Sequence, residues 1–300
     1  MRPSTTWPVM MAVLLASSAA AFAQEASPAP SPSPSATPAP PPQIAFPGQY
    51  AATPDALLRF PPAMTGCRRF NGDERIACLE SLGADFGRLA RYAEANAALA
   101  PRKRGERRVV FFGDSITDNW SKAGYGGFFP GKPYVNRGIG SHTTSQMLVR
   151  FRADVLDLDP DVVVFLAGTN DIAGNTGPIS DESIQRNLMS MAELAKAHGV
   201  RVVLGSILPV SDDKKDANGL ALTRTRQRPT GTIQALNRWL AEYAAKNGHT
   251  YLDYFSATAD ASSLFRPELN DDGLHPNARG YAVMAPLAEK AIAQAMGSRR

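Results

Sequence analysis

Short runs of apolar residues alternate with longer amphipathic segments from residue 108 to the end of the chain. The short runs, rich in Val, Leu and Phe, predict β-strands that are buried on both faces. They cover residues 108–112, 134–136, 162–166, 201–208 and 250–254. The segments between and after them carry apolar residues on one helix face and predict helices. These helices are expected at residues 145–155, 183–198, 232–246 and 277–296. The alternation predicts a three-layer α/β/α sandwich around a mainly parallel, five-stranded sheet with right-handed crossovers.

A further amphipathic stretch precedes the first strand. Its apolar residues recur at helical spacing from Ile76 to Tyr92, and Pro101 marks a stop. The pattern predicts one packing helix over residues 73–99, which leads into the sheet.

The first 49 residues differ from the rest of the chain. Residues 1–23 combine one positive charge, an apolar run and an Ala21-Phe22-Ala23 cleavage site, which is typical of a secretory signal peptide. Residues 24–49 alternate Pro, Ala and Ser and predict a disordered, extended linker. The folded domain is therefore expected over residues 50–300, with residues 50–107 as an N-terminal helical extension. Export to the periplasm or beyond the cell follows from the signal peptide.

Two cysteines, Cys67 and Cys78, are the only ones in the chain. In an exported protein, two cysteines this close predict a disulfide. On one continuous helix their Cα atoms would lie about 16 Å apart, which is too far to bridge. We therefore expect Cys67 to lie in a loop that folds back on a helix beginning near Asp73.

The composition changes this picture little. The chain is 44% hydrophobic and 20% charged, and no apolar run of membrane length follows the signal peptide, so stable membrane insertion is not expected. The formal net charge is +4, but the basic residues are dispersed, which argues against nucleic acid as a partner. The pattern indicates no oligomeric state.

The first strand ends abruptly at Gly113-Asp114-Ser115. Such a turn lifts a serine hydroxyl out at the carboxyl edge of a parallel sheet, where α/β proteins bind ligands. The following helix would aim its free backbone N–H groups at the same place. Taken alone, the segment is equally well an ordinary strand-to-helix turn with a serine at the N-cap.

Polar groups also follow the second and third strands and precede the last helix. Residues 136–144 contain two glycines, residues 168–171 contain Asn170, and Asp272 stands three residues before His275. Each segment has a plain alternative as a βα turn, an Asx-turn or an acidic helix cap. Together, however, they supply the nucleophile, base, orienting carboxylate and oxyanion donors of a serine hydrolase at one edge of the sheet.

This set of motifs resembles the SGNH (GDSL-type) hydrolase family. Residues 113–117, 168–171 and 272–276 match the first, third and last family blocks in order, and the similarity runs from residue 109 to the C-terminus. The resemblance implies a flavodoxin-like α/β/α fold and a catalytic triad of Ser115, His275 and Asp272. It implies no metal and no cofactor.

The resemblance also implies an oxyanion hole. Its donors would be the backbone N–H of Ser115, a backbone N–H from the second block and the side chain of Asn170. The second block usually reads N-x-G-I-S-G, but here Gly140 precedes Ser141, so Ser141 occupies the place of the donor glycine. We expect Ser141 to donate if it can adopt the required φ, with Gly140 as the alternative.

Substrate contacts are less defined by the sequence. Trp120 follows the nucleophile and could line the pocket or pack inside the first helix, and His142 could touch substrate beside the oxyanion turn. The polar insert at residues 212–229 is expected to rim the site as a mobile loop. Its arginines, at positions 224, 226 and 228, would either meet an anionic or sugar substrate or be solvated.

The expected function is that of a secreted serine esterase for short-chain O-acyl esters, mainly acetyl esters, of a small-molecule or polysaccharide substrate such as a carbohydrate. The lack of a long apolar lid disfavours long-chain lipids, although a lysophospholipase or arylesterase is the alternative. A non-catalytic carbohydrate-binding relative would lack a triad member, and none is missing. A metal phosphoesterase would need clustered Asp and His ligands, and His275 is the only well-placed imidazole.

Overall fold

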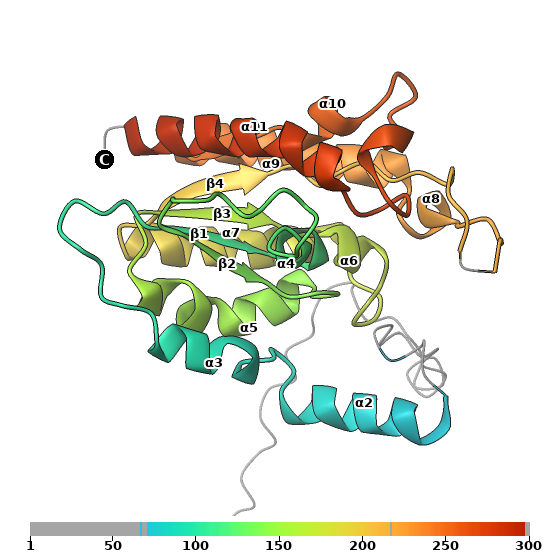
Figure 1. Ribbon diagram of the computed structural model, residues 1–300, viewed down its shortest axis with the longest axis horizontal. Coiled ribbons are helices and arrows are strands. Elements are labelled where there is room, and N and C mark those ends of the chain that lie inside the picture. The colour runs from blue at the N-terminus through green and yellow to red at the C-terminus, as the bar shows by residue number, and fades with distance from the viewer. Residues whose placement is uncertain (1–66, 68–70, 217, 298–300) are drawn as a thin grey trace, which may run out of the picture. The chain divides into compact units, whose positions relative to one another are not determined.

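Five short parallel strands form one sheet in the order β2-β1-β3-β4-β5 (Figure 1). The strands are β1 (Val109–Gly113), β2 (Tyr134–Gly138), β3 (Val162–Leu166), β4 (Arg201–Gly205) and β5 (Thr250–Leu252). The structure, a computed structural model, describes residue 67, residues 71–216 and residues 218–297. The predicted signal peptide and linker therefore lie outside the described residues. Every residue of β1 and β3 is buried, as their continuous apolar runs predicted.

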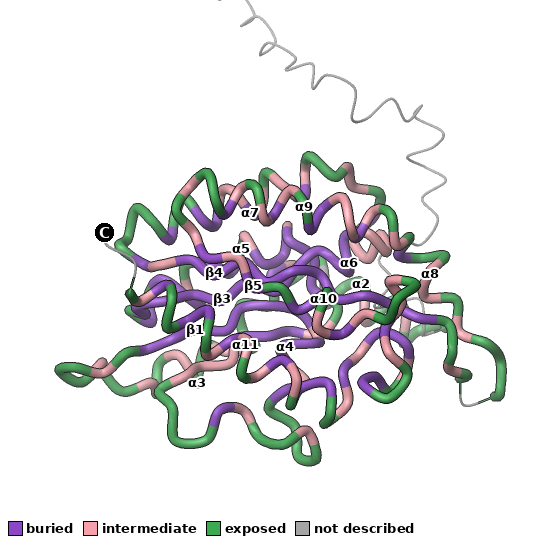
Figure 2. Tube along the Cα trace, turned by 90° about the horizontal axis from the view of Figure 1, so that it is seen from above, coloured by how far each residue is buried: buried purple, intermediate pink, exposed green. Residues whose placement is uncertain are grey.

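Helices cover both faces of the sheet (Figure 2). α5 (Thr144–Asp154), α7 (Asp181–Ala197) and α9 (Thr230–Asn247) pack on one face, and α11 (Ala278–Gly297) packs on the other. Side chains alternate along β1, so Val110 and Phe112 join the first core and Val109 and Phe111 join the second. The predicted three-layer α/β/α architecture is confirmed.

Short helices follow the carboxyl ends of the strands. In Figure 1 the strand arrowheads point toward α4 (Ser115–Asn119), α6 (Thr169–Ile172) and α8 (Arg224–Gln227). A further short helix, α10 (Tyr254–Thr258), and two 3₁₀ turns, η1 (Leu156–Leu158) and η2 (Pro267–Leu269), complete the connections. Elements of four or five residues are too short to show a helical period in the sequence.

The fourth strand ends earlier than predicted, at Gly205 instead of residue 208. Ile207 and Leu208 are still buried, but they lie in a loop. The side chain of Asn237 accepts from the Ile207 N–H at 2.8 Å and donates to the Ile207 carbonyl at 2.9 Å. The buried Asn237 amide thus provides the backbone hydrogen bonds of Ile207 that a neighbouring strand would otherwise provide. The apolar run at residues 201–208 does not show where these strand hydrogen bonds end.

The predicted single helix over residues 73–99 is wrong. Two helices, α2 (Gly72–Ala84) and α3 (Ala90–Ala97), take its place. The Asp85 carboxylate between them accepts from the N–H groups of Leu89 and Ala90, at 2.8 and 3.0 Å, and so starts a new helix. Ile76 and Leu79 on α2 are 55% and 37% exposed, so this part of the apolar stripe does not pack into the core.

The predicted disulfide between Cys67 and Cys78 is present, with a Cα–Cα distance of 5.6 Å. Cys67 lies in a turn before α2, as the distance argument required. In the part of the chain that the structure describes, no helix is long and apolar enough to cross a membrane.

Candidate active site

The turn from β1 into α4 presents Ser115. A side chain at Gly113 would place its Cβ 2.7 Å from the Leu166 carbonyl oxygen, so the tight packing at the strand end requires glycine. Asp114 is the N-cap of α4, and its Oδ1 accepts from the Ile116 N–H at 2.9 Å. Ser115 is therefore the first residue of the helix, where a backbone N–H has no partner within the helix.

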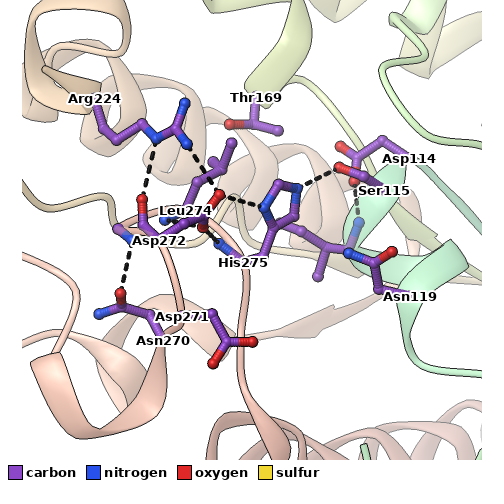
Figure 3. A network of polar contacts seen from close by, with 12 residues as sticks. Asp114, Ser115, Asn119, Thr169, Arg224, Asn270, Asp271, Asp272, Leu274 and His275 are labelled. Carbon is purple, nitrogen blue, oxygen red and sulfur yellow. Dashed lines mark hydrogen bonds and ion pairs between the residues drawn. The ribbon is translucent and has the colours of Figure 1, made fainter. Parts of the chain in front are cut away.

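Ser115, His275 and Asp272 form a continuous hydrogen-bonded chain (Figure 3). Ser115 Oγ lies 2.9 Å from His275 Nε2, and His275 Nδ1 lies 2.9 Å from Asp272 Oδ2. All three residues are half-buried. The fold thus brings together a serine and a histidine that lie 160 positions apart in the chain.

The Asp272 carboxylate also holds the turn that carries Asp272 and His275. Asp272 Oδ1 accepts from the N–H groups of Leu274 and His275, at 3.1 and 2.8 Å. Gly273 has a φ of +77°, and a Cβ there would lie 2.2 Å from the Ser211 carbonyl oxygen. Only glycine fits this place, because the turn needs a positive φ and a close approach to Ser211.

Arg224, in α8, donates to the same carboxylate. Its Nη2 lies 2.9 Å from Asp272 Oδ2, and its Nε lies 3.1 Å from the Asp272 carbonyl oxygen (Figure 3). Burial alone would raise the pKa of Asp272, but the hydrogen bonds and charge of His275 and the charge of Arg224 bring it below its usual value. Asp272 is therefore ionised and fixed in place beside the imidazole.

The Gly140–Ser141 turn lies beside this chain. The His142 N–H donates to the Ile139 carbonyl at 3.2 Å and closes the turn, and Ser141 has a φ of +68°. The Gly140 N–H donates to Asp118 Oδ2 at 3.1 Å. The Ser141 N–H has no acceptor among the described residues. Ser141 therefore has a left-handed backbone conformation, and of the Gly140 and Ser141 N–H groups only that of Ser141 has no acceptor among the described residues.

The Asn170 side chain is buried at the start of α6. Its Nδ2 donates to the His142 carbonyl at 3.1 Å, so one of its two N–H groups is engaged by the turn that contains Ser141. Its Oδ1 accepts from Asn175 Nδ2 at 3.0 Å and from Arg228 Nη2 at 3.4 Å. The second N–H of the Asn170 amide has no protein acceptor in the described part of the chain, so it can serve a ligand.

Two carboxylates beneath the turns are buried. Burial raises the pKa of Asp114 to about 6, although the Ile116 N–H and the charges of His275 and Arg228 oppose this. Burial likewise raises the pKa of Asp171 to about 6. Both oxygens of Asp171 accept from Thr144, whose N–H lies 3.0 Å away, and this ties the third block to the start of α5.

Both predicted substrate contacts are corrected. Trp120 is 2% exposed and packs against Phe111, Phe129 and Tyr281 in the aromatic core. His142 is 1% exposed, and its Nδ1 accepts from Arg150 Nε at 3.1 Å. Burial, with Arg150 and Arg88 nearby, lowers the pKa of His142 to about 2, so the ring is neutral. Neither side chain offers a surface to substrate.

The arginines of the 212–229 insert are not all solvated. Arg226 is exposed, but Arg224 bonds Asp272, and Arg228 is 4% exposed. Arg228 and Asn175 are site residues that the sequence reading missed as such, because a polar loop gives no sign of which side chains turn inward. Among the described residues, no group of three or more His, Cys, Asp or Glu could hold a metal ion.

The chain is similar to a family model, to solved structures and to a further bacterial protein. A family model for GDSL-like lipases and acylhydrolases matches residues 111–283. A proposed acylhydrolase from Bacteroides fragilis is 39% identical with a TM-score of 0.64, covering 70% of this chain and 98% of that one. A GDSL-like lipase from Bacteroides thetaiotaomicron is 38% identical with a TM-score of 0.63, covering 70% and 99%.

The lipoprotein YqeF of Bacillus subtilis, itself uncharacterized, is 32% identical over 126 residues, or 36% of this chain. The match covers 51% of YqeF, so the chain spans about half the length of that relative.

Proposed function

Because the chain belongs to the GDSL-like lipase/acylhydrolase family, we propose that it is a serine esterase with Ser115 as nucleophile. The observation that carries this proposal is the unbroken chain from Ser115 Oγ through the His275 imidazole to Asp272, with 2.9 Å at each step. A serine hydroxyl is a weak nucleophile unless a positioned base takes its proton, and a third group must orient that base.

The reaction starts with attack of Ser115 Oγ on the acyl carbonyl while His275 Nε2 takes the hydroxyl proton. Asp272 keeps the other ring proton on Nδ1 and stabilises the imidazolium that forms. His275 then protonates the leaving alkoxide, which departs as an alcohol and leaves an acyl-enzyme. In the second half His275 activates a water, which releases the acid and regenerates Ser115.

The tetrahedral intermediate places a negative charge on the former carbonyl oxygen. We assign its stabilisation to the backbone N–H groups of Ser115 and Ser141 and to the free N–H of the Asn170 amide. Loss of one such donor typically costs about 3–4 kcal/mol of transition-state stabilisation. No step of this scheme needs a metal or a cofactor.

For substrate, we propose short-chain O-acyl esters, mainly acetyl esters carried by a carbohydrate. The side chains around the triad support this choice: Asn119, Ser141 and Arg224 are polar and at least partly exposed. Such a rim suits a hydroxyl-rich leaving group better than an acyl chain of a lipid. We further propose export through the signal peptide at residues 1–23, with the linker at residues 24–49 joining it to the catalytic domain.

The test is hydrolysis of p-nitrophenyl acetate, butyrate and octanoate, with acetylated xylan alongside, by the wild type and by Ser115→Ala. We expect turnover of the acetates by the wild type and a loss of at least about 10⁴-fold in the variant, with unchanged thermal stability. Retained turnover in Ser115→Ala would remove Ser115 as nucleophile. A preference for octanoate would favour a lipid acylhydrolase, and no turnover at all would favour a binding protein.

A further inference from the structure

Two side-chain N–H groups donate to the oxygen of the Asn170 amide. Asn175 Nδ2 lies 3.0 Å from Asn170 Oδ1, and Arg228 Nη2 lies 3.4 Å from the same atom. Amide groups can be turned by 180°, which exchanges oxygen and nitrogen. Here that exchange would place the Asn170 NH₂ group against two other N–H donors. The two contacts therefore keep the NH₂ group on the opposite side, where it reaches the His142 carbonyl.

Asn175 is also bonded to the other predicted oxyanion donor. The same Nδ2 group donates to the Ser141 carbonyl at 3.2 Å, and the Asn175 N–H donates to the Asn170 carbonyl at 2.9 Å. One carboxamide thus connects the second-block turn to the third-block helix. These two segments supply two of the three proposed oxyanion donors, so their relative position decides whether the donors converge on one point.

Arg228 bonds to the first residue of α6, the helix that carries Asn170. Its Nε lies 3.0 Å from both the carbonyl oxygen and the hydroxyl oxygen of Thr169. The charged groups that face it are Arg224, which repels it, and Asp114 and Asp272, which attract it. A buried guanidinium with two compensating carboxylates and four acceptors, the fourth being the side-chain oxygen of Gln227, is a rigid support.

We propose that Asn175 and Arg228 are positioning residues, which hold the Asn170 amide and the Ser141 turn so that their N–H groups meet the oxyanion. This inference rests on the proposed serine-esterase function. Neither residue touches the reacting atoms. Their contribution appears only when charge develops on the acyl oxygen, so it should change kcat much more than KM.

The experiment compares three Asn175 variants by steady-state kinetics on p-nitrophenyl acetate. Asn175→Ala should lower kcat by about 10- to 100-fold and change KM by less than about threefold. Asn175→Asp has nearly the same shape but replaces the donor with an acceptor, so it should lose at least as much as Asn175→Ala. Asn175→Ala combined with Asn170→Ala should be no more than about threefold worse than Asn170→Ala alone.

Asn247→Ala is the matched control. Asn247 is also half-buried, and its side chain donates to the Tyr243 carbonyl at 2.8 Å at the end of α9, away from Ser115. Asn247→Ala should therefore have a kcat within about twofold of that of the wild type. Arg228→Lys, which keeps the charge but loses the forked contacts, should also lower kcat. If that variant does not fold, the Asn175 variants still decide the question.

Three outcomes overturn the inference while the wild type is active. In the first, the kcat of Asn175→Ala lies within twofold of the wild type. In the second, Asn175→Asp retains a kcat close to that of the wild type. In the third, the loss of kcat in the double variant equals the product of the losses in Asn170→Ala and Asn175→Ala. A wild type that hydrolyses no ester would instead overturn the proposed function and the inference with it.

Discussion

Replacing Asp114 by Asn should stabilise the protein at neutral and alkaline pH. Asp114 Oδ1 accepts one hydrogen bond, from Ile116, whereas its buried Oδ2 has no hydrogen-bond partner among the described residues. Burial raises the pKa of Asp114 from 3.8 to about 6, and this change corresponds to about 3 kcal/mol of unfavourable free energy once the group is ionised. An amide has the same shape, keeps the acceptor for Ile116 and carries no charge.

The sign of the pH dependence follows from proton binding. Between about pH 4 and pH 6 the folded protein holds a proton on Asp114 that the unfolded chain has released, so stability falls as pH rises through this window. Above about pH 6 the full penalty is present. Because Asn does not titrate, the free energy of unfolding of Asp114→Asn minus that of the wild type should be about 2–3 kcal/mol larger at pH 8 than at pH 4.

Urea unfolding of both proteins at pH 4 and pH 8 measures this difference directly. The comparison across pH cancels any constant effect of the amide, such as the cost of its own unbonded N–H group. Asp181→Asn serves as a control, since Asp181 is exposed in the first turn of α7. It should change stability by less than about 1 kcal/mol at either pH. An equal gain for Asp114→Asn at both pH values would refute the reasoning.

Two further variants test the turns around Ser115. Ser141→Gly should raise the free energy of unfolding by about 1 kcal/mol in urea titrations without loss of kcat, because glycine takes a φ of +68° without strain and keeps the backbone N–H; a large fall in kcat would assign a role to the Ser141 hydroxyl instead. Arg224→Gln should lower kcat/KM by about tenfold in ester assays, because Asp272 loses the cation that fixes it. The exposed neighbouring variant Arg226→Gln should leave the rate unchanged, and equal losses in both would point to general loop disruption.

The sheet could be predicted from the sequence because its signals are local and strong. A short continuous apolar run such as residues 162–166 predicts a strand that is buried on both faces, and β3 in the structure has the same limits. The family resemblance drawn from three short blocks is confirmed by the family model over residues 111–283. The helix predicted over residues 73–99 was wrong because the chain turns between α2 and α3, where Arg88 has a φ of +50° and the Asp85 carboxylate accepts from the N–H groups of Leu89 and Ala90.

Burial of individual side chains was harder to predict than the fold. Trp120 and His142 stand next to motif residues, so their place in the sequence suggested substrate contact. Their exposure depends instead on tertiary packing: Trp120 fits against the Phe111 and Tyr281 rings, and His142 accepts from the buried Arg150. A sequence reveals which residues are near the nucleophile in the chain, but the direction of each side chain depends on its packing partners.

The same limit explains why the supporting residues of the site were missed. Arg150, fully buried, donates to the carbonyls of Gly113 and Arg137 at 2.9 and 2.8 Å and to the His142 ring, so it joins the ends of β1 and β2 to the turn that contains Ser141. Arg224 donates to Asp272, and Arg228 donates to the Thr169 carbonyl at the start of α6. Each of these arginines donates to a backbone carbonyl at the carboxyl edge of the sheet, and a guanidinium supplies several donors in a fixed plane. The groups proposed for catalysis lie on short turns, and the hydrogen bonds from Arg150, Arg224 and Arg228 help to hold these turns in place.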